Sequence, residues 1–403
     1  MHTVLRGEMG MVWWFYVPNI VFGEDALTEL ETIDGTKAFI VTDKVINSLG
    51  LAERVCSMLT SRMWEAAIWD GAVPDPKVST VNEAADAMKR FGADWIIAIG
   101  GGSVMDTAKA AWVLYEKPDV ELHALTPFDE LGLRAKARLI CIPTTTGTGS
   151  EATKAIVIRD DETGRKFATI NPELTPDIAI LDPEFVVGLP KDMTAYTGMD
   201  ALTHAVEGYV SVWKNDFSDG CSLQAVRMIF EWLPKSVEDL SNLEIREKMQ
   251  IAACLAGMSF GNSQAALAHS LGHSMGSVLR TQHGMSVGMA LPYTIEFNCR
   301  GKENEEAARQ YMELARMIGI SGRKPETVSL KFAVSIRELM SQIGTPRSFK
   351  EAGIKKKDFN AALENMVDFA MMDTSLTMNP RNIDSEGIRK MYKYMYDGTV
   401  IDF

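Results

Sequence analysis

The sequence predicts a chain of two parts, an α/β region with a parallel sheet followed by a region made only of helices. Up to about residue 188, short apolar runs alternate with amphipathic segments, which is typical of a parallel sheet covered by helices. From about Pro190 onward, apolar residues recur with the 3.6-residue period of helices and strand signals almost vanish. We therefore expect an α/β domain over residues 1–189 and an all-helical domain over residues 190–403.

The individual elements follow from the same patterns. Strands are expected at residues 12–17, 37–42, 66–69, 94–99, 138–142, 156–158, 167–170 and 178–181, the last three near the edge of the domain. Helices are expected at residues 44–61, 77–91 and 103–115 in the first part, and at 192–211, 218–239, 244–260, 265–279, 303–318, 326–342, 357–371 and 385–396 in the second.

Composition excludes several classes of partner. The 403 residues are 46% hydrophobic and carry a net charge of −13, which argues against nucleic acid or an anionic membrane as the main partner. No apolar run approaches the ~20 residues of a membrane span. The five cysteines are scattered and form no C-x-x-C motif, which favours a reducing, cytoplasmic location. A homodimer or larger homo-oligomer is the default expectation for an enzyme of this size.

The stretch from Thr197 to Glu207 carries the first chemical signal. Asp200 and His204 are four residues apart in a helical pattern, so they lie on one face, one turn apart, and could hold one divalent ion. Three of the six histidines, His269, His273 and His283, fall in one later segment. One Asp with two or three neutral imidazoles suits Zn²⁺ or Fe²⁺. Histidines that are merely solvated or hydrogen-bonded on helices are the alternative.

Geometry limits which of these histidines could share an ion. On one straight helix, His269 and His283 would lie about 21 Å apart, too far for a common ligand sphere. The chain must therefore leave the helix between them, and Gly276, the run 280–282 and Gly284 are the places where it could do so. Residue spacing alone does not select among the three histidines.

Two loops in the first part have the composition of phosphate-binding loops. The segment Gly100-Gly101-Gly102-Ser103-Val104-Met105-Asp106 follows an expected strand and opens an expected helix, where bare backbone and a helix N-terminus favour a pyrophosphate. The segment Pro143-Thr144-Thr145-Thr146-Gly147-Thr148-Gly149-Ser150-Glu151 also follows a strand and is rich in hydroxyl donors. Tight structural turns are the alternative for both. The G-x-G-x-x-G fingerprint and a Gly-Lys-Ser/Thr ending are absent.

Asp43 stands at the end of the expected strand 37–42. An acid there can accept hydrogen bonds from a ribose diol and would repel a 2′-phosphate, which favours NAD over NADP. A helix N-cap is an equally good reading of the same residue.

Together these motifs resemble the iron-containing (group III) alcohol dehydrogenase family, over nearly the whole chain from about Pro18. The resemblance rests on GGGSVMD, PTTTGTGSE, GMDALTHAVE and AHSLGHSMG with QHG, in the order and spacing of the family. It implies a Rossmann-like, dehydroquinate synthase-like fold, with a dinucleotide-binding domain, a helical metal-binding domain and an active site between them. It also implies NAD and Fe²⁺ or Zn²⁺ as cofactors and an alcohol or aldehyde as substrate.

The resemblance assigns roles to single residues. It implies that the metal ligands are Asp200, His204, His269 and His283, and that His273 is a catalytic residue near the substrate and the nicotinamide. It implies cofactor contacts from Asp43, Gly101, Gly102, Ser103, Thr144, Thr145, Thr148 and Lys166, to which we add Gly100 and Asp106 of the same Gly-rich segment. Asp75 stands where family members often have Asn, which puts one contact on the adenosine side in question.

Four other functions share some of these features, and a non-catalytic NAD-binding module, one of them, would not need four metal ligands with an open position. A glycerol or polyol dehydrogenase would use the same residues with Zn²⁺. A non-redox, NAD- and metal-dependent lyase of the dehydroquinate synthase branch would need several basic residues near the metal motifs, where the sequence offers few. A metallohydrolase would leave both loops unexplained, and no H-E-x-x-H motif occurs.

Overall fold

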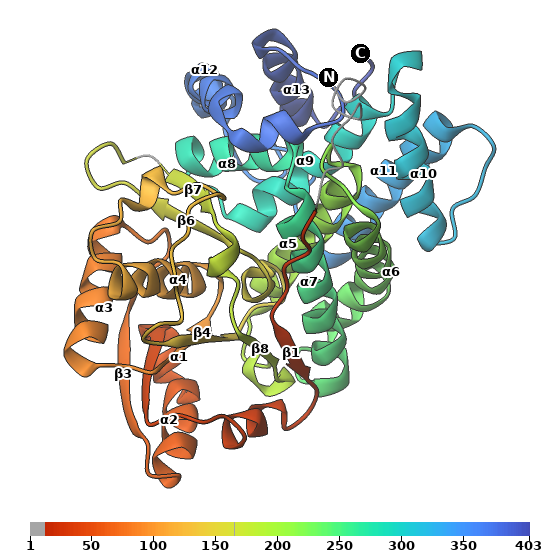
Figure 1. The fold of residues 1–403 in the computed structure, drawn as a ribbon. Helices are drawn as coiled ribbons and strands as arrows, with labels where there is room; N and C mark the ends of the chain where they lie inside the picture. The colour runs from red at the N-terminus through yellow and green to blue at the C-terminus, as the bar shows by residue number, and fades with distance from the viewer. Residues whose placement is uncertain (1–12, 165) are drawn as a thin grey trace.

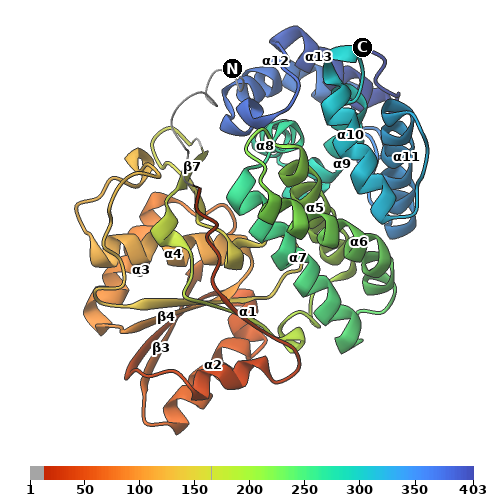
Figure 2. The ribbon, with the colours of Figure 1, turned by 45° about the vertical axis from the view of Figure 1, so that its right-hand side comes forward.

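The computed structural model describes residues 13–164 and 166–403 and divides into the two expected regions. Figures 1 and 2 show a sheet with its helices at one end of the molecule and a larger body of helices at the other. The helical region begins with α5 at Lys191. A domain boundary at residues 189–190 remains a proposal.

A six-stranded parallel sheet forms the centre of the first region. Its strand order is β1-β8-β5-β4-β2-β3, and every neighbouring pair is parallel. The strands are β1 (Asn19–Phe22), β2 (Lys37–Asp43), β3 (Glu65–Ala72), β4 (Trp95–Gly100), β5 (Arg138–Pro143) and β8 (Ile178–Leu181). The helices of this region are α1 (Lys44–Ser48), α2 (Leu51–Ser61), α3 (Val78–Phe91) and α4 (Gly102–Glu116), with a short helix η1 (Ala26–Glu31).

Apolar side chains on both faces bury the sheet between helices. Because side chains alternate along a strand, Phe39 and Val41 face the core shared with α3 and α4, whereas Ala38 and Ile40 face the core shared with η1 and α2. A parallel sheet buried on both faces explains why its strands read as continuous apolar runs rather than alternating ones.

Several expectations for this region were wrong in detail. The strand expected at 12–17 is absent from the described residues 13–17, residue 12 lies outside the described part, and the first strand is instead β1. The helix expected at 44–61 is broken into α1 and α2, because Gly50 takes a left-handed conformation between them. The strand at 178–181, expected near the edge, lies inside the sheet between β1 and β5.

The two other strands expected near the edge form a separate hairpin. β6 (Ala155–Arg159) and β7 (Lys166–Ile170) pair antiparallel with each other in a second sheet of two strands. Ile156 and Ile158 point from β6 into the core around α4, which anchors the hairpin on the first region.

The second region is helical among the described residues. Its helices are α5 (Lys191–Val210), α6 (Asp216–Glu238), α7 (Leu243–Ser263), α8 (Leu267–Leu279), α9 (His283–Asn298), α10 (Glu305–Met317), α11 (Pro325–Ile343), α12 (Lys356–Met372) and α13 (Ser385–Asp397). One continuous apolar core links these helices. None of the helices in the described part of the chain combines the length and apolarity needed to cross a membrane.

The sequence analysis missed one helix, α9. Nearly all of its residues are buried, and it contains Gly284, Gly288 and Pro292. A helix that is buried all round has no polar face, so the amphipathic period used to find the other helices is absent. The break between α8 and α9 falls in the expected run 280–282, where Arg280 is left-handed at φ 59°.

The two regions meet where the Thr-rich loop after β5 packs against α7. Gly149 in this loop has φ 59°, and a Cβ atom placed on it would lie 2.5 Å from the Cα of Gly257 in α7. Only two glycines allow the backbones to come so close. This contact therefore fixes the loop relative to the helical region.

We expect Gly149→Ala to destabilise the protein more than Gly50→Ala does. Both positions are left-handed, which costs a non-glycine residue about 1–2 kcal/mol, but nothing lies within 4 Å of the Cβ position at Gly50. At Gly149 the clash with α7 should add about 1–3 kcal/mol. Urea unfolding of the two variants beside the parent measures the difference, and equal losses would contradict the close packing.

Candidate metal and nucleotide site

Three helices bring the predicted metal ligands together. Asp200 and His204 lie one turn apart on α5, His269 lies in the first turn of α8, and His283 is the first residue of α9. The first three are buried, whereas the side chain of His283 is 42% exposed. The cluster is thus enclosed on the helix side and open on the side of His283.

The distances within the cluster suit one shared cation. The Nε2 atoms of His204, His269 and His283 lie 3.8, 3.8 and 3.3 Å from Oδ1 of Asp200. Two ligand atoms about 2.1 Å from a tetrahedral ion are about 3.4 Å apart, close to these values. The ligand atoms of Asp200, His269 and His283 all lie within 4.8 Å of one another, a set that does not include His204.

Unsatisfied polar atoms point to a ligand at the same place. Oδ1 of Asp200 and Nε2 of His269 are buried and have no hydrogen-bond partner among the described residues. Buried polar atoms are rarely left without partners, because losing hydration without a new bond is costly. A carboxylate oxygen and an imidazole nitrogen are donor atoms that Fe²⁺ and Zn²⁺ accept, so the residues present fit such an ion.

Burial and neighbouring charges shift the pKa values of Asp200, His204 and His269. Burial opposes ionisation of Asp200, but the surrounding imidazoles hold its pKa well below the usual value. Burial lowers the pKa of His204 to about 3, so this ring is neutral, as a metal ligand must be. Burial also disfavours charge on His269, but Asp200 and Glu207 outweigh it and raise its pKa to about 10. The two carboxylates therefore favour a positive charge beside His269, whereas burial keeps His204 uncharged.

Sequence reasoning did not assign roles to two side chains that hold the cluster. Glu207 on α5 accepts a hydrogen bond from Nδ1 of His269, with a separation of 2.6 Å. Phe260 on α7 stacks on His204 with ring centroids 3.9 Å apart. Glu207 lies in the same motif, about one turn beyond His204, so its position in the sequence could have indicated a role.

His273 lies beside the cluster rather than in it. Its ring stacks on His283 with centroids 5.3 Å apart, and its Nδ1 lies 2.7 Å from Oδ2 of Asp373. Burial opposes ionisation of Asp373, but His273 and the backbone N–H of Ser375 lower its pKa to about 2. Asp373 follows α12, one hundred residues after His273, and no local pattern links the two residues.

The two candidate nucleotide loops lie side by side at the carboxyl ends of β4 and β5. A Cβ atom on Gly101 would lie 3.2 Å from Cγ2 of Thr145, and one on Gly102 would lie 3.0 Å from Cγ2 of Thr148. Gly100 ends β4, and Ser103 is in the first turn of α4. In parallel sheets, ligands bind at the carboxyl ends of the strands, so the two loops together form one candidate site.

Hydroxyl groups in the Thr-rich loop are available for a ligand. Oγ1 of Thr145 and Oγ1 of Thr146 are buried without a hydrogen-bond partner in the described structure. Thr144 is buried, and Oγ1 of Thr148 accepts from the backbone N–H of Ser150. Thr146 was not singled out from the sequence, although it lies in the quoted motif.

Both carboxylate oxygens of Asp106 accept hydrogen bonds from other parts of the protein, which its position in the sequence did not predict. Its Oδ1 accepts from Oγ of Ser150, and its Oδ2 accepts from the backbone N–H of Val157. Burial raises its pKa to about 6. Both oxygens are therefore engaged inside the protein, where they tie the Thr-rich loop and β6 to α4. The prediction of a direct cofactor contact from Asp106 gains no support from this geometry.

The other two predicted cofactor residues also have protein partners. Oδ1 of Asp43 accepts from the backbone N–H groups of Val45 and Ile46, so Asp43 is the N-cap of α1 and keeps Oδ2 for other donors. Nζ of Lys166 pairs with Asp75, which also pairs with Arg159 at 3.0 Å. The Asp that departs from the family pattern thus interacts directly with the predicted cofactor lysine.

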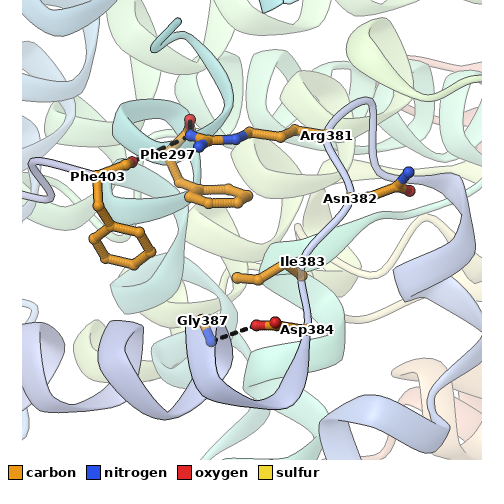
Figure 3. Close-up of a pocket in the computed structure, with 7 residues that line it drawn as sticks. All are labelled: Phe297, Arg381, Asn382, Ile383, Asp384, Gly387 and Phe403. Atoms are coloured by element: carbon orange, nitrogen blue, oxygen red, sulfur yellow. Dashed lines mark hydrogen bonds between the residues drawn. The ribbon is translucent and has the colours of Figure 1, made fainter.

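Two surface hollows are lined by residues other than the proposed metal ligands. One of about 440 Å³ is lined by residues near the C-terminus, where Arg381 stacks on Phe297 and donates to the backbone oxygens of Phe297 and Phe403 (Figure 3). Another, of about 530 Å³, includes Tyr196 and Met285. Arg381 uses its guanidinium to hold the C-terminal segment, so the first hollow is a product of packing.

Comparison with known proteins identifies the family. Residues 18–183 match the model of iron-containing alcohol dehydrogenase, and residues 194–396 match that of the C-terminal part of the Fe-containing alcohol dehydrogenase family. The chain is 36% identical over 387 residues to the NADPH-dependent butanol dehydrogenase of Clostridium saccharobutylicum, covering 96% of the chain and 98% of that protein.

A longer relative and a solved structure agree with this match. The chain is 39% identical to aldehyde-alcohol dehydrogenase 2 of Entamoeba histolytica over 95% of its own length, but it spans only 46% of that protein. An alcohol dehydrogenase structure from Oenococcus oeni superposes with a TM-score of 0.88 at 30% identity, covering 96% of the chain and all of that structure. With the metal-ligand cluster and the two loops in place, the chain belongs to the iron-containing alcohol dehydrogenase family.

Proposed function

We propose that the protein is a metal-dependent alcohol dehydrogenase that transfers a hydride reversibly between a primary alcohol or diol and NAD. The observation that carries the proposal is the cluster of Asp200, His269 and His283, whose ligand atoms lie within 4.8 Å of one another. Family membership supports the same reaction class. A reaction of this kind needs a cation site and a nucleotide site in contact.

The two candidate sites are in direct contact through α5. A Cβ atom on Gly147 of the Thr-rich loop would lie 2.4 Å from the backbone oxygen of Thr197, one turn before Asp200. A nucleotide on this loop would therefore lie close to the proposed metal ligands, as hydride transfer requires. We assign phosphate and ribose contacts to Gly100, Gly101, Gly102, Ser103, Thr144, Thr145, Thr148, Asp43 and Lys166, and we give Asp106 the supporting role described above.

The proposed ligands are Asp200, His204, His269 and His283, for Fe²⁺ or Zn²⁺. A divalent ion, when bound, lowers the pKa of an alcohol hydroxyl and polarises a carbonyl in the reverse direction. The chain provides the remaining functions. The open side at His283 gives the substrate its approach, and His273, oriented by Asp373, is our candidate to carry the proton away. A homodimer in the cytoplasm remains a prediction from the sequence.

Activity should appear with NAD and short primary alcohols or diols once the correct metal is supplied. The test is formation of NADH or NADPH at 340 nm, with protein stripped of metal and then reconstituted with Fe²⁺ or Zn²⁺ in the absence of oxygen. We also expect a chelator to abolish the activity of the reconstituted protein. Preference for glycerol would favour a polyol dehydrogenase, and nucleotide and metal binding without hydride transfer to any alcohol would favour the lyase branch.

His269→Ala should abolish metal retention. The substitution removes Nε2 of His269, a buried atom without a hydrogen-bond partner in the described structure. It also removes one of the imidazoles that stabilise the ionised carboxylate of Asp200. The measurement is metal content after dialysis, with His123→Ala as the matched control because His123 is exposed and outside the cluster. A His269→Ala protein with full metal content and normal turnover would contradict the ligand assignment.

Asp43→Asn should shift cofactor preference toward NADP without loss of stability. Asn keeps an oxygen for the N–H groups of Val45 and Ile46 and is as good an N-cap as Asp, but it removes the charge that repels a 2′-phosphate. We expect the ratio of kcat/KM for NADP to that for NAD to rise about tenfold, or ~1.4 kcal/mol.

Asp43→Ala serves as the control for capping, since it should cost about 1 kcal/mol of stability. One relative is named as an NADPH-dependent butanol dehydrogenase and another, from Bacillus methanolicus, as an NAD-dependent methanol dehydrogenase, so cofactor choice varies among similar chains. A parent protein that prefers NADP, or an unchanged ratio in Asp43→Asn, would show that Asp43 does not read the 2′ position.

A further inference from the structure

A buried carboxylate lies next to the ligand cluster without belonging to it. Glu207 is two turns beyond Asp200 on α5 and only 2% exposed. No Lys or Arg of the described chain forms an ion pair with it; its ion-pair partner is His269. A buried carboxylate without a cationic side chain needs strong hydrogen-bond donors to offset its lost hydration.

Three N–H groups supply those hydrogen bonds, and all three come from the start of α8. Oε2 of Glu207 accepts from the backbone N–H of Ala266 at 2.8 Å and from Nδ1 of His269 at 2.6 Å. Oε1 accepts from the backbone N–H of Ala268. Figure 2 shows α5 and α8 lying next to each other, as this bridge requires. One side chain thus caps the N-terminus of α8 and holds the histidine in its first turn.

The hydrogen bond to Glu207 decides which nitrogen of His269 carries the proton. A carboxylate only accepts, so Nδ1 must donate, and in the neutral ring Nε2 then presents its lone pair. Nε2 lies 3.8 Å from Oδ1 of Asp200 and has no hydrogen-bond partner among the described residues. Stacking on His204, with centroids 4.6 Å apart, restricts the plane of the ring.

We propose that Glu207 is a positioning residue that fixes the tautomer and orientation of His269 for a divalent cation. This inference rests on the proposed function, because it assumes that the cluster holds a metal. Its effect should appear in metal affinity, and carboxylates that orient a ligating imidazole in this way typically change affinity about 10–100-fold.

Glu207→Gln tests the proposal with almost no change of shape. The amide has one acceptor oxygen and one NH₂ group, so it cannot accept from both sides. With its oxygen toward Ala268, its NH₂ group opposes the N–H of Ala266 and faces Nδ1 of His269, which then must accept, so the proton moves to Nε2. With its oxygen toward Ala266 and His269, its NH₂ group opposes the N–H of Ala268, and the bond to Nδ1 loses its charge assistance, so both arrangements weaken the hold on His269. We expect the Kd for Co²⁺ or Zn²⁺, measured by competition with a chelator, to rise at least tenfold.

Two comparisons separate positioning from general destabilisation. Glu296→Gln is the matched control, because Glu296 is also buried and held by Arg337 and the N–H of Ile401. Glu296 lies thirteen residues after His283 on α9, about 20 Å along the helix. Its replacement should lower the Tm and leave metal affinity within about twofold, whereas Glu207→Gln should also alter the visible absorption spectrum of the Co²⁺ form.

A double-mutant cycle completes the test. If Glu207 acts through His269, then Glu207→Gln should cause no further loss in the weak residual Co²⁺ affinity of a His269→Ala background, measured by direct titration with excess Co²⁺ because that variant retains no metal on dialysis. A loss of the same factor in both backgrounds, or equal affinities of the parent and Glu207→Gln, would overturn the proposal. Should Glu207→Gln fail to fold, Glu207→Asp replaces it, because Asp keeps the charge but withdraws the oxygen from Nδ1 by one methylene. A parent protein that binds neither metal would overturn the proposed function as well.

Discussion

The contact on which the rest of the site depends is the approach of three histidine Nε2 atoms to Oδ1 of Asp200. It requires α8 and α9 to pack tightly on α5, and glycines make this possible. A Cβ atom on Gly284 would lie 2.2 Å from the backbone oxygen of Tyr196, and one on Gly288 would lie 2.7 Å from Cβ of Met199. Gly284 and Gly288 weaken the amphipathic pattern of α9, which is one reason why the sequence did not predict this helix. The same glycines allow Nε2 of His283 to lie 3.3 Å from Oδ1 of Asp200.

Helix α5 also connects the proposed metal site with the proposed nucleotide site. The Thr-rich loop touches α5 at Thr197 and α7 at Gly257, both through glycines that leave no room for a side chain. Lys109 of α4 is fully buried and donates from Nζ to the backbone oxygens of Ser150 and Thr153. The loop is thus held from the sheet side by α4 and from the other side by the helical region, so these packed elements set its distance from the cluster of proposed ligands.

The sequence predicted what depends on local spacing and missed what depends on distant contacts. The i, i+4 pair of Asp200 and His204 followed from helix geometry, as did the need for a break between His269 and His283 if they share an ion, although Gly276 and Gly284 were as acceptable as the run 280–282 for its place. Asp373 could not be found in this way, because it meets His273 only after α12 has folded back across one hundred residues. Asp43 and Asp106 show another limit. A carboxylate after a strand can cap a helix, brace a loop or bind a ribose, and only the positions of neighbouring N–H groups distinguish these uses.

His269 and His273 show how environment separates two chemically identical groups. They are one turn apart on α8, and the Nδ1 atom of each is bound to a carboxylate, Glu207 for one and Asp373 for the other. The side chain of His269 is 3% exposed and its Nε2 faces Asp200, whereas that of His273 is 33% exposed and stacks on His283. A buried, oriented imidazole suits a permanent ligand, and a half-exposed one beside it suits proton exchange with solvent. On the proposed assignment, burial rather than residue type or spacing therefore distinguishes the metal ligand from the proton carrier on this helix.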